Sequence, residues 1–218
     1  MNQVRFRTAD GLELEGEIRP ADGTPRGTAV LCHAHPRHGG SKDHPILWAI
    51  RNDLAAKRGL TVLAFNFRGI MGSEGTYGGG EAELLDAAAA VDRVRQEAPG
   101  PTLIVGWSFG AWVGLRHAML DRRVAALALL GFPVGPAFHS ERRPLPSLAE
   151  LESLPGPVLF VTGDGDEFCP VPELRSLAGW IPRGEIIVVP DADHYLGRRE
   201  REVAELVGYW VDAALQTS

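Results

Sequence analysis

The residues best suited to chemistry in this chain begin with a serine held between two glycines. Ser108 lies in the sequence Gly-Trp-Ser-Phe-Gly of residues 106–110, after the apolar run 102–105 and before a helix-like segment. Flanking glycines allow a sharp turn in which the backbone lies so close to neighbouring chain that a Cβ would clash. A serine presented on such a strand-to-helix turn is typical of a catalytic nucleophile.

A base and an acid that could serve Ser108 follow two later apolar runs. His194 follows the run 185–189 and is the candidate base. Asp164 and Asp166 stand in the sequence Gly-Asp-Gly-Asp that follows another apolar run, and either is a candidate acid. A serine hydroxyl needs a base to take its proton and an acid to orient that base, so these residue types are the ones that acyl transfer requires.

A loop dense in histidine and glycine follows the first buried run. His33, His35 and His38 reproduce the histidine spacing of a dinuclear zinc motif. That motif has an aspartate immediately before its third histidine, whereas this chain has Arg37 there, and a fixed cation beside a divalent metal is unfavourable. We therefore expect no metal and no other cofactor.

Hydrophobic periodicity predicts the elements that position these residues. Two alternating segments, 4–7 and 12–18, flank an Asp-Gly turn signal and predict an antiparallel hairpin with one solvated face. Continuous apolar runs predict buried strands at 28–32, 60–65, 102–105, 124–130, 157–162 and 185–189. Helical spacing and helix boundaries predict helices over 45–58, 81–96, 111–120, 172–180 and 198–215.

This alternation of strands and helices predicts an α/β fold. A leading hairpin followed by alternating elements indicates a mostly parallel sheet of about seven or eight strands, with helices on both faces. Right-handed crossovers would bring the loops after the strands to one edge of the sheet. Residues 1–218 are interpreted as a single domain, and the irregular connection 132–156 as a short surface excursion rather than a large cap or lid.

Composition limits the classes of partner and compartment. The net charge is −6 and no basic tract is present, which argues against nucleic acid and anionic membrane surfaces. Residues 1–10 lack the apolar core of a signal peptide, and no apolar run is long enough to span a membrane. Two cysteines, Cys32 and Cys169, fit a reduced cytoplasmic setting, although one disulfide is compatible with the sequence. A monomer or a homodimer is expected.

Taken together, these motifs resemble the α/β-hydrolase superfamily, in particular its small bacterial members without a lid, close to dienelactone-hydrolase-like proteins. The resemblance spans nearly the whole chain, and the order serine, aspartate, histidine is that of the family. The residues that carry it are His33-Ala34-His35-Pro36, Gly39-Gly40, Asn66-Phe67-Arg68-Gly69, Gly72-Ser73-Glu74-Gly75, Gly106-Trp107-Ser108-Phe109-Gly110, Gly163-Asp164-Gly165-Asp166 and Asp193-His194.

The resemblance implies a role for each candidate of the triad. Ser108 would be the nucleophile and His194 the general base. Asp166 would be the acid, because the second aspartate of such a loop usually serves, while Asp164 would hydrogen-bond backbone within the turn. Arg68 is interpreted as a residue that pins neighbouring loops, with substrate binding as the less favoured alternative.

The resemblance also implies an oxyanion hole built from two backbone N–H groups. One is that of Phe109 at the amino end of a helix, where unpaired donors and the helix dipole favour negative charge. The other is that of His35, in the loop after the first buried run. Pro36 has no N–H and is excluded.

An open, shallow pocket is expected because the chain has no sizeable insertion. Such a site favours small or short-chain carboxylic esters, and hence a carboxylesterase acting through an acyl-enzyme. Candidate wall residues, with a place in the hydrophobic core as the alternative for several of them, are His38, Trp107, Phe109, Phe132, Phe138, Phe168 and Tyr195. A thioesterase or a peptidase or amidase on the same triad remains an alternative, as does a non-catalytic small-molecule receptor with a hydrolase fold.

Overall fold

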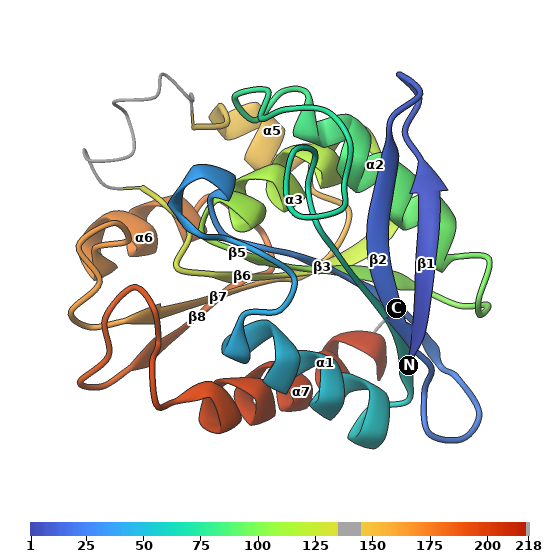
Figure 1. The fold of residues 1–218 in the computed structure, drawn as a ribbon. Coiled ribbons are helices and arrows are strands. Elements are labelled where there is room, and N and C mark those ends of the chain that lie inside the picture. Colours follow the sequence, from blue (N-terminus) through green and yellow to red (C-terminus); the bar gives the residue numbers. More distant parts are fainter. Residues whose placement is uncertain (135–144, 217–218) are drawn as a thin grey trace.

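A computed structural model of the chain describes residues 1–134 and 145–216. Within these ranges one eight-stranded sheet lies between helices (Figure 1). The strands are β1 (Asn2–Arg7), β2 (Glu13–Arg19), β3 (Gly27–Cys32), β4 (Leu60–Phe65), β5 (Thr102–Trp107), β6 (Val124–Leu130), β7 (Val158–Gly163) and β8 (Gly184–Val189). The helices are η1 (Pro36–His38, a 3-10 turn), α1 (Pro45–Lys57), α2 (Glu83–Val94), α3 (Phe109–Leu120), α5 (Leu148–Glu152), α6 (Val171–Ala178) and α7 (Glu200–Gln216). None of the described helices is long and apolar enough to cross a lipid bilayer.

The sheet is mostly parallel and begins with an antiparallel hairpin, as the sequence predicts. Its strand order is β1-β2-β4-β3-β5-β6-β7-β8. The β1–β2 and β2–β4 pairs are antiparallel, and the other neighbouring pairs are parallel. Because parallel strands end at the same edge of the sheet, the loops that follow β3, β5, β7 and β8 meet there.

Burial on both faces explains the continuous apolar sequences of the central strands. Along β3, Val30 and Cys32 belong to the core that includes side chains of α2 and α3, whereas Ala29 and Leu31 belong to the core that includes side chains of α1 and α7. Figure 1 shows these two pairs of helices on opposite faces of the sheet. Successive side chains of a strand point to opposite faces, so one short strand contributes to both cores.

The connection over 132–156 is less irregular than the sequence analysis suggests. Its described part contains α5, whose start is fixed by a capping box. Glu150 N–H donates to Ser147 Oγ at 3.4 Å, and Ser147 N–H donates to the Glu150 carboxylate at 2.8 Å. The Ser-x-x-Glu pattern is a known helix-start signal and could have predicted this turn. Residues 135–144 lie outside the described residues, so the expected absence of a large lid stays a prediction.

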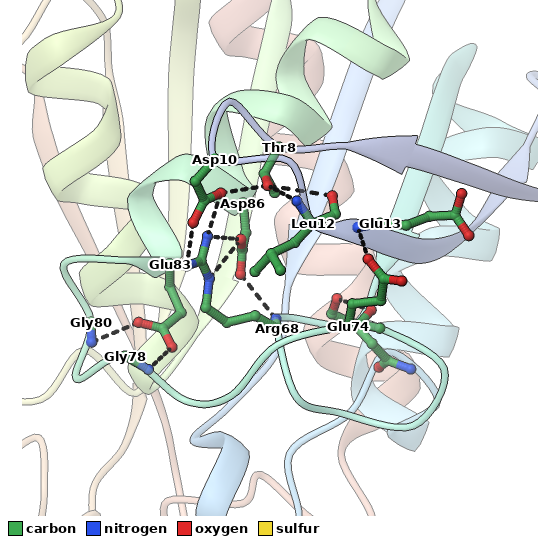
Figure 2. Close-up of polar contacts among 12 residues, drawn as sticks. Thr8, Asp10, Leu12, Glu13, Arg68, Glu74, Gly78, Gly80, Glu83 and Asp86 are labelled. Atoms are coloured by element: carbon green, nitrogen blue, oxygen red, sulfur yellow. Dashed lines mark hydrogen bonds and ion pairs between the residues drawn. The ribbon is translucent and has the colours of Figure 1, made fainter.

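Arg68 joins three segments that are distant in sequence (Figure 2). Its Nη2 donates to Asp86 Oδ1 on α2 at 2.7 Å, and its Nη1 donates to Asp10 Oδ2 in the β1–β2 turn at 2.9 Å. Its backbone N–H donates to Asp86 Oδ2 at 2.9 Å. Both Arg68 and Asp86 are buried, and burial raises the pKa of the Asp86 carboxyl while Arg68 opposes this rise. These contacts agree with the interpretation of Arg68 as a residue that pins neighbouring loops.

Glu83 holds the C-terminal end of the loop that begins after Arg68. The Glu83 carboxylate accepts from the backbone N–H groups of Gly78 and Gly80, each at 2.7 Å (Figure 2). Tyr77 immediately precedes the first of these glycines. Fixed at both ends, the loop gives the Tyr77 side chain a defined position.

The buried Arg68–Asp86 pair leads to a prediction about stability. Asp86→Asn leaves the Arg68 guanidinium with the more exposed Asp10 as its charged partner. We expect the free energy of unfolding to fall by about 3 kcal/mol, because the buried positive charge is then only partly compensated. Asp92→Asn is the matched control, since Asp92 lies on the same helix and pairs with Arg123 at the surface. Surface pairs contribute less than about 1 kcal/mol. Urea unfolding followed by circular dichroism measures both, and equal losses would contradict this account.

Candidate active site

Ser108 occupies the turn between β5 and α3 in a backbone conformation that residues other than glycine rarely adopt. Its φ is 53° and its ψ is −115°. Its N–H donates to the carbonyl of Leu130 on β6 at 2.8 Å, and its own carbonyl accepts from Ala111 N–H at 2.9 Å. Hydrogen bonds on both sides therefore hold a strained residue in place, an arrangement that is common where a reactive side chain must be presented.

The two flanking glycines are required by close backbone approach. A Cβ on Gly106 would overlap the backbone of Gly110 and Ala111. A Cβ on Gly110 would overlap the carbonyl group of Cys32 at the end of β3. The turn that carries Ser108 is thus packed directly against the strand whose following loop is expected to supply an oxyanion donor.

His194 lies between Ser108 and Asp166, within hydrogen-bond distance of both. Its Nε2 is 2.9 Å from Ser108 Oγ, and its Nδ1 is 2.9 Å from each carboxylate oxygen of Asp166. Because the carboxylate accepts at Nδ1, we assign the imidazole proton to that nitrogen, which leaves Nε2 as the acceptor for the serine hydroxyl. The three side chains form one chain of hydrogen bonds from carboxylate to hydroxyl.

The Asp166 carboxylate is buried and held by its own loop. Its side chain accepts at Oδ1 from the backbone N–H groups of Phe168 and Cys169, each at 2.9 Å. Asp164, by contrast, is exposed, and its backbone N–H donates to the carbonyl of Val189. The structure therefore brings Asp166, and not Asp164, to the histidine.

The Trp107 side chain is buried and contacts the loop that carries His194. The side chain is 3% exposed, and its Nε1–H donates to the backbone carbonyl of His194 at 3.2 Å. The His44 ring packs on the indole with centroids 4.1 Å apart. Trp107 therefore supports the loop that carries His194, which corrects its interpretation as a pocket wall. The alternation along β5 is the missed signal, because Leu103, Val105 and Trp107 share one core.

Phe132 also belongs to the core rather than to a pocket wall. Its side chain is fully buried and packs edge-on against Phe160, with ring centroids 5.6 Å apart. Phe132 lies two residues after the end of β6, and its contact with β7 is a tertiary contact that the local sequence does not reveal. Phe138, the other phenylalanine suggested for this segment, lies outside the described residues.

Three of the suggested wall residues do present surface near the site. Phe168 is 39% exposed and its ring centroid is 4.8 Å from that of His194. Tyr195 is 59% exposed with a centroid 5.9 Å from that of His194. His38 is also exposed, and its ring centroid lies 4.7 Å from that of His35.

The two residues expected to supply oxyanion donors lie on adjoining elements. Phe109 is the first residue of α3, where the helix dipole favours negative charge. His35 lies in the loop after β3, immediately before η1, and its ring centroid is 5.2 Å from that of Phe109. The structure thus brings the two residues together next to Ser108.

Histidine side chains give the loop after β3 its shape. His33 is fully buried, its Nε2 accepts from Phe67 N–H at 3.0 Å, and its Nδ1–H donates to the carbonyl of Ala34 at 2.6 Å. His35 Nδ1 accepts from Arg37 N–H at 3.1 Å. Burial lowers the pKa of His33 to about 4, so this ring is neutral at pH 7.

The histidine spacing of the zinc motif does not assemble a metal site in the described part of the chain. Within residues 1–134 and 145–216, no group of three or more His, Cys, Asp or Glu side chains is placed to hold a metal ion. His33 Nε2 and His35 Nδ1 each accept a hydrogen bond from a backbone N–H instead.

Tyr77 is a site residue that sequence reasoning does not identify. Its hydroxyl oxygen is 3.2 Å from His35 Nε2, and its ring centroid lies 5.8 Å from that of Phe109. Because His35 Nδ1 already accepts a hydrogen bond, Nε2 carries the proton and donates to the Tyr77 hydroxyl. The glycine-rich sequence of 71–80 predicts a loop there, but it gives no indication of the direction in which the loop runs.

Comparison with known proteins identifies the family. A family model described as an alpha/beta hydrolase domain matches residues 27–218. The chain belongs to the alpha/beta hydrolase family. The motifs on which the resemblance was based are therefore assigned to the correct family.

Known structures are similar to this hydrolase over nearly its full length. A putative alpha/beta hydrolase of unknown function from Agrobacterium tumefaciens is 27% identical, with a TM-score of 0.84 and coverage of 100% of this chain and 98% of that one. An alpha-beta serine hydrolase homologue from Coxiella burnetii is 27% identical, with a TM-score of 0.83 and coverage of 96% and 97%. An uncharacterised protein from Rickettsia prowazekii is 26% identical over 215 residues, or 95% of this hydrolase and 87% of that protein.

The buried His33 gives this hydrolase a predictable response to acid. Its pKa falls from 6.5 to about 4 on burial, so between these values the unfolded chain binds a proton that the folded chain does not. The free energy of unfolding should therefore decrease as the pH falls through this interval, by roughly 3 kcal/mol for this group. His33→Gln should be less stable at pH 7 and should lose this part of the pH dependence. Urea unfolding between pH 7 and 4 measures it, with His38→Gln as an exposed control.

An unchanged pH dependence in His33→Gln would show that other groups account for the acid response. Loss of the same pH dependence in His38→Gln would argue against burial of the His33 ring as its cause.

Proposed function

We propose that this protein is a serine hydrolase that cleaves small or short-chain carboxylic esters through an acyl-enzyme on Ser108. The observation that carries the proposal is the continuous hydrogen-bond chain from Asp166 through His194 to Ser108 Oγ, with 2.9 Å at each link. This geometry supports the assignment of Ser108 as nucleophile, His194 as base and Asp166 as orienting acid.

Each residue would have one task in the acylation step. Ser108 Oγ forms a bond to the ester carbonyl carbon while His194 Nε2 takes the hydroxyl proton. Asp166 stabilises the resulting imidazolium, which then gives the proton to the departing alkoxide as the bond between carbon and alcohol oxygen breaks. Water repeats the sequence on the acyl-enzyme and releases the carboxylic acid. The backbone N–H groups of Phe109 and His35 would hold the oxyanion in both halves.

The position of the reactive atoms supports a small substrate. Ser108 is partly exposed and the His194 side chain is 11% exposed, so the nucleophile and base lie close to the surface rather than at the end of a deep tunnel. A long acyl chain gains little from such a site, because it has few apolar walls to contact. Cys32 and Cys169 are free and buried, which is compatible with a reducing cytoplasmic compartment.

Covalent labelling of the nucleophile tests the proposal directly. A fluorophosphonate probe should label the wild-type protein at Ser108 and should not label Ser108→Ala, because the probe requires an activated serine. Mass spectrometry of the labelled peptide locates the modified residue. Absence of labelling in the wild type would favour the alternative of a non-catalytic receptor.

The identity of the acid can be tested with a matched pair of substitutions in one loop. Asp166→Asn should lower kcat by about 10⁴-fold on an ester substrate, because the imidazole would no longer be held as the correct tautomer. Asp164→Asn should change kcat by less than about threefold, since its side chain is exposed and it lies in the same turn without reaching the histidine. A larger loss in Asp164→Asn than in Asp166→Asn would reverse the assignment.

A further inference from the structure

Two exposed aromatic rings lie against the ring of His194. Phe168 and Tyr195 expose 39% and 59% of their surface. Their ring centroids are 4.8 Å and 5.9 Å from that of His194. Exposed apolar side chains that are grouped around a reactive residue are typical of a binding surface.

Hydrogen bonds hold the backbones of Phe168 and Tyr195 in place before any ligand binds. Phe168 N–H donates to Asp166 Oδ1 at 2.9 Å, and the Phe168 carbonyl accepts from Val134 N–H at 3.1 Å. Tyr195 N–H donates to Asp193 Oδ1 at 2.9 Å, and its ring packs edge-on against Trp107. A ligand that contacts these rings therefore loses little free energy in ordering them.

The chemistry of the proposed function fixes which part of an ester meets this surface. His194 Nε2 must return its proton to the departing alcohol oxygen, so that oxygen lies within hydrogen-bond distance of the histidine. The remainder of the alcohol then extends over the surface beside the histidine ring. The oxyanion side is separate, because there the His35 ring packs against Phe109 and Tyr77.

We propose that Phe168 and Tyr195 form a leaving-group surface that selects esters of arylalkyl alcohols. The inference rests on the proposed function and adds the class of alcohol to it. In the favoured reaction, the bond between Ser108 Oγ and the acyl carbon forms and the bond from that carbon to the arylalkyl oxygen breaks. The serine proton leaves with the alcohol through His194. Offset or edge-to-face contact between the alcohol's ring and the two side chains supplies the selectivity.

Four esters test the side of the ester on which an aromatic ring is recognised. Benzyl acetate and cyclohexylmethyl acetate differ in ring type on the alcohol side, and methyl phenylacetate and methyl cyclohexylacetate differ in the same way on the acyl side. After division by the rates of hydroxide hydrolysis, we expect kcat/KM to favour benzyl over cyclohexylmethyl acetate by about five- to tenfold. The acyl-side pair should differ by less than about twofold.

Substitutions then connect the preference to the two rings. Phe168→Leu and Tyr195→Leu together should reduce the benzyl preference to less than about twofold. The preference is a ratio of two esters measured within one variant, so a uniform loss of rate in the double variant leaves it unchanged. Tyr209→Leu, which alters an exposed tyrosine of α7 packed on Arg58, is the control and should keep the full preference.

The outcomes separate this inference from the proposal beneath it. A wild-type enzyme that is labelled and hydrolyses esters but shows no alcohol-side preference would overturn the inference alone. A preference that persists in the double variant would do the same. Absence of both labelling and hydrolysis in the wild type would overturn the proposed function, and the inference with it.

Discussion

The arrangement of this site depends on two missing Cβ atoms. At Gly106 and Gly110 the backbone of the turn lies so close to its surroundings that a methyl group would overlap main-chain atoms. One of those contacts is with Cys32, at the end of β3, so the start of α3 is packed directly on the strand that leads into the loop of His35. Ser108 and that loop come from neighbouring parallel strands, and this close packing is what places them together. A larger residue at either glycine would separate the nucleophile from the loop.

A second set of interactions supports the loop that carries His35. Arg68 ties the end of β4 to α2 through Asp86, and Glu83, one turn earlier on the same helix, holds the far end of the loop that follows. Between these two anchors lies Tyr77, whose hydroxyl accepts from His35. The buried ion pair is therefore more than a stabilising contact, because it helps to position the ring that meets the loop beside the nucleophile.

The sequence predicts the fold and the meeting of Ser108, Asp166 and His194 because both follow from local patterns. Apolar runs mark the buried strands, and the residues that follow each run necessarily lie at one edge of a parallel sheet. The face of the sheet to which a given side chain points is harder to predict from sequence. The serine pattern alone suggests a pocket wall at Trp107, whereas the alternation along β5 places the indole in the core with Leu103 and Val105. Tyr77 reaches His35 across 42 positions of sequence, and nothing in either local pattern encodes that contact.

The anchoring of the loops that carry Asp166 and His194 has a consequence for how the proposed enzyme can diversify. The hydrogen bond from position 168 to Asp166 and the one from position 195 to Asp193 both originate from main-chain N–H groups. Any residue except proline supplies the same donor. The side chains at these two positions can therefore change in evolution without removing the hydrogen bonds that hold the carboxylate and the loop of the histidine. Under the proposed function, the protein thus combines a fixed arrangement of Ser108, His194 and Asp166 with two neighbouring positions whose side chains single substitutions can change.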